Sequence, residues 1–585
     1  MYLVRCCFCL LLASSLCRGQ YRRGVNVAGA EFGMSNLPGT QGRDYTFNSE
    51  NTFRYFADKE LGLIRLPLQW ERLQHTPGGP LDTAYLAGVK QDVAWAAAHG
   101  AEIILDVHNY ARYSVSSGGP LQTYVIDNKA ADGSVKVTSA DLANLWVRLS
   151  NEFRFERAVY AYDLMNEPHD MGQGNWKAIS QTVLNAIRAN QDDKLVLIPG
   201  DSWSSANRWV SVHGPSGWIQ DPANNFAYEA HQYFDSDESG TYKSTYDAEL
   251  ARNSDLANVG KTRVSHFIAW CQSNQVSCIV DEFGIPYNDA RWATVLDNFF
   301  GALDAAGMDG AYWAAGEWWP ATDLLSVQPS ANFTQDRPQM STLQAHLGGG
   351  FLTALSAASL NVARAVPGSL VTVYGTAFTA QTAQQQGAPY PLALADITVT
   401  VTDASGAAAP AGLLYASPGQ INLQVPQQLT ATGRATIAVM RGGSTVASGS
   451  IQVAATTPAV FTFNSAGFGL PAAQVIRVKA DGTQTYEPVA RFDSTRNGFV
   501  AIPIDFGPAS DRVFLALYAT GVRGSTATVR IGPAAIPAVF APSAQYPGLD
   551  QVNVELPRSL AGSGATDVTL TCDGVAANTV TVTFQ

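Results

Sequence analysis

The chain has 585 residues, which is too long for a single hydrophobic core, so we expect two or more domains. Its formal net charge of -12 argues against nucleic acid or an anionic membrane surface as a partner. A neutral polymer is compatible with that charge, and the charged fraction of 15% is ordinary for a secreted protein.

The amino terminus has the pattern of a secretory signal. Arg5 supplies a positive charge, an apolar run covers residues 6–16, and small or polar residues follow. The apolar run is too short to span a bilayer. Leu16 stands before Cys17, where lipoprotein signals usually carry a small residue. We therefore predict a signal peptide at residues 1–19 and release to the outside of the cell rather than lipid anchoring.

The next part of the chain, up to residue 347, alternates apolar runs with amphipathic helical patterns. The predicted strands are 24–28, 63–68, 102–107, 159–165, 195–199, 226–230, 278–281 and 310–313. Helical patterns between them include 84–99, 141–153, 176–190, 261–274 and 290–306. Because the strands are apolar throughout rather than alternating, they fit strands that are covered on both faces.

Eight such units favour an α/β fold, specifically a (β/α)8 TIM barrel, as a first domain at residues 20–347. A doubly wound open sheet is the alternative, but no glycine-rich phosphate loop follows the first strand.

Polar or aromatic residues stand late in, or just after, seven consecutive predicted strands. They include Arg65, His108, Asn166, Glu167, Trp203, His231, Tyr233, Glu282 and Trp313. Active sites of TIM barrels lie at the carboxyl ends of the strands, so we expect these side chains to share one cleft. Taken singly, His108 and His231 could be hydrogen-bonded core histidines, and Trp313 could be ordinary barrel packing.

Glu167 and Glu282 each follow a short apolar strand. Two carboxylates at corresponding strand ends are the minimum for cleaving a glycosidic bond. One protonates the leaving oxygen, and the other attacks the sugar or activates water. Either glutamate alone would more often be a solvated loop residue or a helix-capping carboxylate.

The composition changes after about residue 351. All twelve tryptophans lie between Trp70 and Trp319, and the last of the eight histidines is His346. The remainder is rich in Ala, Thr, Val and Gly and shows alternating strand patterns. Segments 371–378 and 417–426 resemble segments 515–522 and 546–557. We therefore predict two related immunoglobulin-like β-sandwich domains, at residues 355–460 and 461–585.

Cysteine usage agrees with export, because four of the seven cysteines lie in the predicted signal. Cys271 and Cys278 could form a disulfide or remain two buried thiols, and the sequence leaves both alternatives open. Cys572 has no obvious partner. No Cys/His spacing suggests zinc, and we expect neither a metal nor a cofactor.

Three motifs together resemble glycoside hydrolase family 5, and most closely its bacterial and fungal endoglucanases. They are Asn166-Glu167-Pro168, His231-Gln232-Tyr233 and Glu282-Phe283-Gly284. The contexts of Arg65, His108 and Trp313 agree, and the resemblance covers about residues 22–345. It implies a secreted retaining enzyme that cleaves internal β-1,4-glucosidic bonds of cellulose or a related β-glucan by double displacement.

The resemblance also implies catalytic roles. Glu167 would be the general acid/base and Glu282 the nucleophile. Arg65 should lie beside Glu282 and hold that carboxylate ionised. His231 should orient or tune Glu167, and Tyr233 should hydrogen-bond the nucleophile.

For substrate binding, the resemblance places Asn166 at the sugar 2-hydroxyl, and His108 and Trp313 at the walls of the cleavage subsite. For four further tryptophans, packing and sugar platform are equally good interpretations: Trp70, Trp203, Trp318 and Trp319. Asp106, Asp163 and Asp281 are expected to serve barrel structure.

Two alternatives stay open. The same mechanism could act on mannan, xyloglucan, xylan or mixed-linkage glucan, because specificity lies in loops such as 110–137 and in aromatic placement. A non-catalytic glycan-binding surface protein is the rival from another class, although the two glutamates argue against it. The tryptophan-free carboxyl-terminal region resembles β-rich domains of large acidobacterial secreted proteins. A spacer or a cell-surface or matrix attachment is favoured there over a carbohydrate-binding module.

Overall fold

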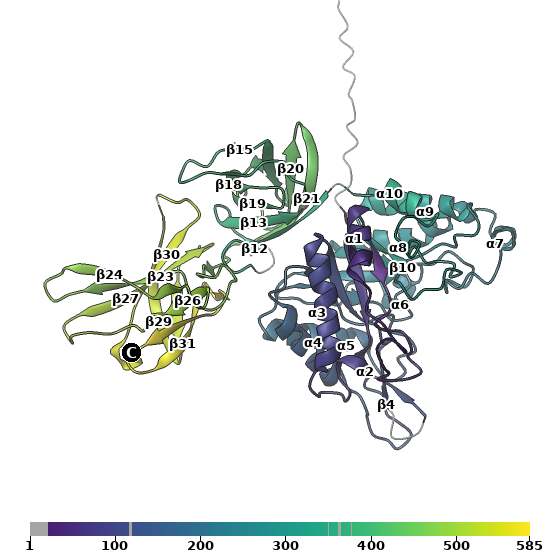
Figure 1. The fold of residues 1–585 in the computed structure, drawn as a ribbon, viewed down its shortest axis with the longest axis horizontal. Helices are drawn as coiled ribbons and strands as arrows, with labels where there is room; N and C mark the ends of the chain where they lie inside the picture. Colours follow the sequence, from purple (N-terminus) through teal and green to yellow (C-terminus); the bar gives the residue numbers. More distant parts are fainter. Residues whose placement is uncertain (1–20, 116–119, 349, 361–363, 376, 544) are drawn as a thin grey trace, which may run out of the picture.

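The computed structural model describes residues 21–115, 120–348, 350–360, 364–375, 377–543 and 545–585. The predicted signal at 1–19 lies outside these residues. A barrel surrounded by helices, purple to teal in Figure 1, stands beside two groups of strands drawn in green and yellow. Among the helices of the described part, none has the length and apolar character needed to cross a membrane.

Eight parallel strands close into a barrel in the order β1-β10-β9-β8-β7-β6-β3-β2. Their bounds are β1 Arg23–Val27, β2 Leu63–Leu68, β3 Glu102–Val107, β6 Val159–Asp163, β7 Leu195–Pro199, β8 Phe226–His231, β9 Ser277–Glu282 and β10 Asp309–Ala315. Each predicted strand lies on one of these, so the TIM-barrel prediction is confirmed and the open sheet is excluded. The loop after β3 carries a hairpin, β4 Arg112–Val115 and β5 Gln122–Val125.

The helices surround the barrel. They are α1 Glu50–Asp58, α2 Trp70–Leu73, α3 Thr83–Ala98, α4 Ser139–Phe153, α5 Trp176–Ala189, α6 Trp209–His213, α7 Tyr246–Arg252, the 3-10 turn η1 Leu256–Asn258, α8 Val259–Asn274, α9 Trp292–Ala306 and α10 Met340–Ala345. Their starts follow from local chemistry. Thr138 and Asp141 form a reciprocal capping box at α4, and the Asp82 side chain accepts a hydrogen bond from the Tyr85 amide at α3.

The barrel interior is layered, because side chains two residues apart share a face of a strand. One buried cluster consists of Leu63, Ile104, Ala161, Leu197, Ala227 and Ile279. We call it the lower apolar layer. Two residues further along five of these strands stand Arg65, Asp106, Asp163, Glu229 and Asp281, all with 0% exposure. We call this set the upper charged layer, which lies nearer the carboxyl ends of the strands.

The rest of the chain is all β. A first sheet of 11 strands contains β11 Gly350–Ser356, β12 Arg364–Ala365, β13 Leu370–Gly375, β14 Ala383–Gln384, β15 Ala393–Leu394, β16 Ile397–Thr402, β17 Ala408–Pro410, β18 Gly412–Ala416, β19 Gln420–Gln424, β20 Gly433–Arg441 and β21 Ser444–Val453. A second group contains β22 Ala459–Val460, β23 Ala473–Val478, β24 Gln484–Pro488, β25 Ala490–Asp493, β26 Gly498–Ala501, β27 Arg512–Thr520, β28 Ala527–Ile531, β29 Ala534–Pro542, β30 Asp550–Glu555, the 3-10 turn η2 Arg558–Leu560, β31 Gly564–Cys572, β32 Val575–Ala576 and β33 Val580–Phe584.

The internal repeat in the sequence corresponds to a repeated strand pair. Strand β13 pairs antiparallel with β19, with Thr372 opposite Asn422. Strand β27 pairs antiparallel with β30, with Ala516 opposite Asn553. The two groups of strands also enclose separate hydrophobic cores. Strands of this kind agree with the predicted β-sandwich region, while the domain limits themselves stay a prediction.

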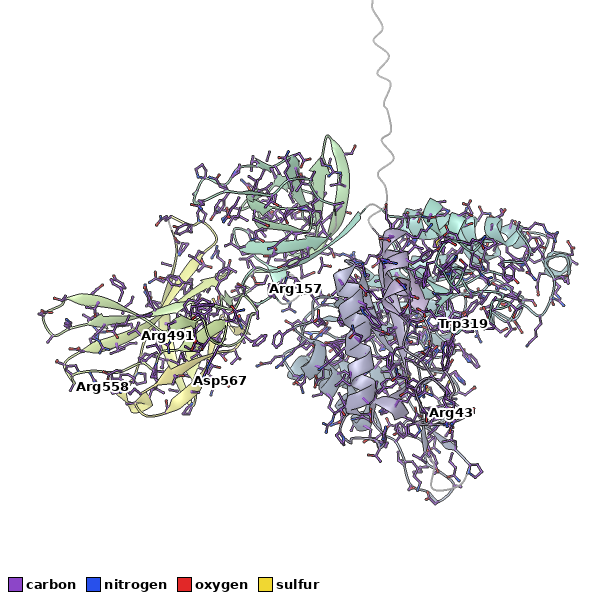
Figure 2. The ribbon with its side chains drawn as sticks, in the orientation of Figure 1. Arg43, Arg157, Trp319, Arg491, Arg558 and Asp567 are labelled. Carbon is purple, nitrogen blue, oxygen red and sulfur yellow. A yellow bond between two sulfur atoms is a disulfide. The ribbon has the colours of Figure 1, made fainter. Side chains whose placement is uncertain are left out.

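The first group of strands contacts the barrel at the amino-terminal ends of its strands. The Arg434 guanidinium donates a hydrogen bond to Ser277 Oγ at 2.7 Å, at the start of β9. The Arg157 guanidinium, just before β6, lies 4.4 Å from the ring centroid of Tyr374. Figure 2 shows Arg157 on the side of the barrel that faces these strands, with Trp319 away from them. A crevice of about 720 Å³ remains at this junction.

Cys271 at the end of α8 and Cys278 in β9 form a disulfide, which decides between the two alternatives that the sequence left open. Cys572 is a buried free cysteine. The disulfide therefore joins the end of a helix to the strand that carries Glu282.

Candidate active site

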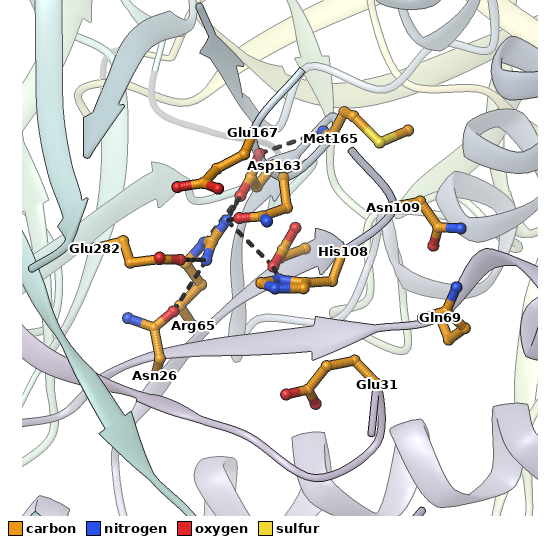
Figure 3. Close-up of polar contacts among 12 residues, drawn as sticks. Asn26, Glu31, Arg65, Gln69, His108, Asn109, Asp163, Met165, Glu167 and Glu282 are labelled. Atoms are coloured by element: carbon orange, nitrogen blue, oxygen red, sulfur yellow. Dashed lines mark hydrogen bonds and ion pairs between the residues drawn. The ribbon is translucent and has the colours of Figure 1, made fainter. Parts of the chain in front are cut away.

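The two glutamates meet at the carboxyl ends of the barrel strands (Figure 3). Glu167 follows β6 and Glu282 ends β9. A carboxylate oxygen of Glu167 and one of Glu282 lie within 4.8 Å of each other. Retaining glycosidases hold the two carboxyl groups roughly 5–5.5 Å apart, and inverting ones roughly 6.5–9.5 Å apart. The approach of the two carboxylates is therefore closer to the retaining than to the inverting spacing.

Glu282 has two direct partners, one on each oxygen. Arg65 Nη1 donates to Oε2 at 3.2 Å, and the Tyr233 hydroxyl donates to Oε1 at 3.0 Å. The Glu282 side chain is buried, with 6% of the residue exposed. A guanidinium and a phenolic hydroxyl thus each hold one oxygen, and together they fix the orientation of the carboxylate.

Glu167 contacts His231. The distance from His231 Nδ1 to Glu167 Oε1 is 2.8 Å, and the same nitrogen lies 3.7 Å from Glu282 Oε2. Burial acts to lower the pKa of His231, but Glu282 and Glu167, together with Glu229, outweigh it and hold this pKa well above its usual value. The φ angle of Glu167 is +42°, a conformation uncommon outside glycine and frequent where backbone strain accompanies a functional site.

Asn166, directly before Glu167, is held by Arg65. Its Oδ1 accepts a hydrogen bond from Arg65 Nη2 at 3.0 Å, which fixes the orientation of the amide. Asn166 is 1% exposed, and its Nδ2 has no hydrogen-bond partner among the described residues. A buried amide donor without a protein partner is available to a bound ligand.

Arg65 is the centre of the upper charged layer. Its Nη2 lies 2.7 Å from Asp163 Oδ2, 3.1 Å from Asp106 Oδ2 and 3.9 Å from Glu229 Oε1, and its Nε lies 3.5 Å from Asp281 Oδ2. Burial lowers the pKa of Arg65, but these four carboxylates raise it well above its usual value. Burial also raises the pKa of Asp281 to about 7.

His108 forms a wall of the site. Its Nδ1 lies 2.7 Å from Asp106 Oδ2, and its ring stacks on Trp313 with centroids 5.4 Å apart and planes 16° apart. Burial lowers the pKa of His108. The neutral ring then donates from Nδ1 to Asp106 and accepts at Nε2 from the Tyr110 hydroxyl at 3.3 Å.

The site contains a continuous row of aromatic rings, with neighbouring centroids 4.5 to 6.3 Å apart. In order they are Trp203, His169, Tyr110, His108, Trp313 and Trp319. Trp203 and Trp318 are 39% and 40% exposed. Trp70 is fully buried and donates from Nε1 to Gln74, so of its two interpretations packing is the correct one.

Sequence reasoning missed three residues around the site. Asn26 donates from Nδ2 to the Asp281 carbonyl and accepts from Arg65. Glu31 is 4% exposed, accepts a hydrogen bond from the Gly29 amide at 2.7 Å, and has a pKa raised by burial to about 7. Glu229 belongs to the upper charged layer. For Asn26 and Glu229 the available signal was a polar residue inside an otherwise apolar strand, whereas Glu31 lies beyond the end of β1 and had no such signal.

Carboxylates surround His231 closely enough that a bound metal ion has to be considered as an explanation of the cluster. Glu167 and Glu282 lie on one side of the imidazole, and Glu229 and Asp281 on the other, with ligand atoms within 4.8 Å in each group. Both ring nitrogens already contact carboxylate oxygens at hydrogen-bonding distance. The geometry is therefore that of an ion-pair network around a histidine.

Comparisons with known proteins agree with this architecture. The family Cellulase (glycosyl hydrolase family 5) matches residues 25–320. A probable endo-β-1,4-glucanase B of Aspergillus oryzae is 30% identical over 333 residues, which cover 56% of this chain and 90% of the relative. Endo-β-1,4-glucanase B of Aspergillus niger is 28% identical over 309 residues, covering 52% and 84%.

Among solved structures, endoglucanase Cel5A of Pseudomonas stutzeri is 35% identical and covers 56% of this chain and 94% of its own, with a TM-score of 0.49. The family match, together with the A. oryzae relative, shows that the chain belongs to glycosyl hydrolase family 5.

Proposed function

We propose that this protein is a retaining endo-β-1,4-glucanase that cleaves internal bonds of cellulose or a related β-glucan. The observation that carries the proposal is the approach of Glu167 and Glu282 to within 4.8 Å, with separate partners for each carboxylate. The substrate class comes from the names of the relatives, which are endo-β-1,4-glucanases.

In the first step, Glu282 attacks the anomeric carbon while Glu167 gives its proton to the glycosidic oxygen that leaves. The product is a glycosyl ester on Glu282. Arg65 and Tyr233 hold the Glu282 carboxylate in position before attack. The unpartnered Nδ2 of Asn166 is the donor for the sugar 2-hydroxyl, a contact that strengthens in the transition state.

In the second step, Glu167 is an anion and acts as a base. It takes a proton from water, and the resulting hydroxide equivalent attacks the anomeric carbon and frees Glu282. Glu167 is the more exposed of the two carboxylates, with a side chain 16% accessible against 8% for Glu282. Greater accessibility at Glu167 suits the group that exchanges protons with leaving group and water.

The aromatic row supports cleavage inside a chain. Trp203 and His169 stack on each other at one end of the row. Trp313 and Trp319 continue the row beyond His108 at the other end. Faces of pyranose rings are apolar and stack on aromatic side chains. A row of this length suits a substrate that extends over several sugar rings. The same features would serve mannan, xyloglucan, xylan or mixed-linkage glucan, which remain the alternative substrates.

We also propose that the protein is secreted and divided into a catalytic domain at 20–347 and two β-sandwich domains at 355–460 and 461–585. The separate cores of the three parts support this division. The carboxyl-terminal domains would act as a spacer or as an attachment to a cell surface or matrix.

The test uses protein lacking residues 1–19 and the Glu282→Ala variant, with carboxymethyl cellulose, glucomannan and xylan as substrates. On the cellulose derivative we expect viscosity to fall quickly while few reducing ends appear. Glu282→Ala should lower the rate by at least about 10⁴-fold without unfolding the protein. Full activity of that variant would contradict the mechanism. Activity confined to mannan or xylan would keep the mechanism and change the substrate.

A further inference from the structure

His231 is held between carboxylates on both of its ring nitrogens. Nδ1 lies 2.8 Å from Glu167, and Nε2 lies 2.9 Å from Glu229 Oε1 and 3.7 Å from Asp281 Oδ1. His231 is 3% exposed, and Glu229 and Asp281 are 0% exposed. The imidazole therefore connects the cleft to the upper charged layer.

The backbone explains why these groups converge. Glu229 and His231 are two residues apart on β8, so both side chains point into the barrel, with Glu229 below. The pairing of β8 with β9 shifts register here: Ala230 lies opposite Val280, but His231 lies opposite Glu282. This irregularity brings both Asp281 and Glu282 next to one imidazole.

Proton counting limits the states of this group. A short contact between an imidazole nitrogen and a carboxylate oxygen avoids repulsion only when one of the two atoms carries a proton. Glu229, His231 and Glu167 make two such contacts, of which the one at Nε2 is an ion pair without aligned hydrogen-bond geometry. The imidazole therefore carries a proton on each nitrogen, and the acid proton on the other oxygen of Glu167 is a third. When Glu167 gives up its proton, the one left at His231 Nδ1 must stabilise the new carboxylate, while the proton at Nε2 faces Glu229.

We propose that Glu229 is a positioning residue for this reaction: it holds a proton on Nε2 of His231, so that Nδ1 is the nitrogen that shares a proton with Glu167. Its catalytic meaning rests on the proposed function. In the first step the Glu167 proton goes to the leaving oxygen. The His231 imidazolium, which pairs with Glu229 through Nε2, then faces the Glu167 carboxylate through Nδ1. In the second step Glu167 regains a proton from water, and the protonation of His231 is unchanged over the cycle.

The charges around His231 come from three strands. Glu167 follows β6, Glu229 lies on β8, and Asp281 and Glu282 lie on β9. Behind them, Arg65 of β2 lies 3.9 Å from Glu229 and binds Asp163 and Asp106. Replacing Glu229 by glutamine removes the negative end behind His231 and favours neutral imidazole. The imidazolium lies nearer to Glu167 and Glu282 than Glu229 does, so the variant loses a positive charge beside both carboxylates.

The experiment compares wild-type protein with Glu229→Gln. The amide can donate to Nε2, so nitrogen NMR of the histidine ring should show protons on both ring nitrogens in the wild type and on Nδ1 alone in the variant. We expect both limbs of the pH profile of kcat/KM to move upward by about one pH unit, and kcat to fall about 10- to 100-fold. KM should change less than about 2-fold, because the buried Glu229 lies behind His231 rather than in the cleft.

Two variants control for structure. Glu229→Asp keeps the charge and should restore part of kcat and of the original pH profile. Asp192→Asn removes another buried carboxylate, which accepts hydrogen bonds from Ser150 and Tyr162 between the helices and β6. It should leave the His231 signals and the pH profile unchanged.

A wild-type His231 without a proton on Nε2, or a folded Glu229→Gln variant with unchanged ring signals and pH profile, would overturn the proposal. The NMR measurement needs no substrate. It therefore decides the Glu229–His231 relation even if the wild type hydrolyses none of the glycans, an outcome that would count only against the proposed function.

Discussion

The two layers inside the barrel come from the same strands and differ in what they do. The lower apolar layer is a small hydrophobic core, and burying such surface favours folding. The upper charged layer surrounds one guanidinium with four carboxylates at 0% exposure. Buried ion pairs seldom stabilise more than apolar side chains of the same size would. The two layers thus lie only two residues apart along each strand. The lower apolar layer stabilises the barrel, and the upper charged layer sets the electrostatics of the cleft.

The largest effect is expected from Arg65→Met, which tests the upper charged layer. It keeps most of the side-chain volume but leaves Asp163, Asp106, Asp281 and Glu229 without their cation. We expect a loss of about 3–5 kcal/mol in the free energy of unfolding, measured with urea, together with loss of hydrolysis. Arg65→Lys keeps the charge and should lose less stability. A Met variant as stable as the wild type would show that the charged layer needs no cation.

Ile104→Ala tests the lower layer. Ile104 is fully buried in that cluster, two residues before Asp106. We expect the free energy of unfolding to fall by about 2–5 kcal/mol, because a cavity replaces the lost side-chain atoms. The pH profile of the remaining folded enzyme should match the wild type. A shifted profile would mean that the two layers are not separable.

A smaller effect is expected from Glu31→Gln, as a change in how stability depends on pH. The pKa of Glu31 is raised from 4.5 to about 7 in the folded protein, so between these values the folded state keeps a proton that the unfolded chain releases. This contribution is complete below about pH 4.5 and is lost as the pH rises through about 7.

The pH-dependent contribution of Glu31 to the free energy of unfolding amounts to at most about 3 kcal/mol. Urea unfolding of both proteins at pH 5 and pH 8 measures it. The wild type should lose more stability between these two pH values than Glu31→Gln does. Equal losses would contradict a buried, protonated Glu31.

The barrel was predictable from sequence because its strands are uniformly apolar and end in polar residues. Local signals of this kind report strand position and burial. The approximate membership of the cleft followed from the same rule, since Glu167, His231 and Glu282 all stand at strand ends and do come together. Their catalytic roles remain predictions.

The composition of the upper charged layer could not be derived in the same way. Asp106, Asp163 and Asp281 were expected to be structural, and Glu229 was not singled out. Whether an inward-facing acid meets a cation depends on strand register around the closed barrel. The shift between Ala230 and His231 in the β8–β9 pairing has no local sequence signal. Nor could spacing alone decide between a disulfide and two thiols at Cys271 and Cys278.

Two contacts join the barrel to the first carboxyl-terminal sheet: Arg434 of that sheet binds Ser277, and Arg157 of the barrel lies over Tyr374. Their position limits how the protein can be attached to a support. These contacts lie at the amino-terminal ends of the strands, and Glu167 and Glu282 lie at the opposite ends. A tether attached to the carboxyl-terminal region therefore leaves the aromatic row facing outward. On an insoluble fibre or a resin, the cleft would point away from the support and toward the bulk polymer.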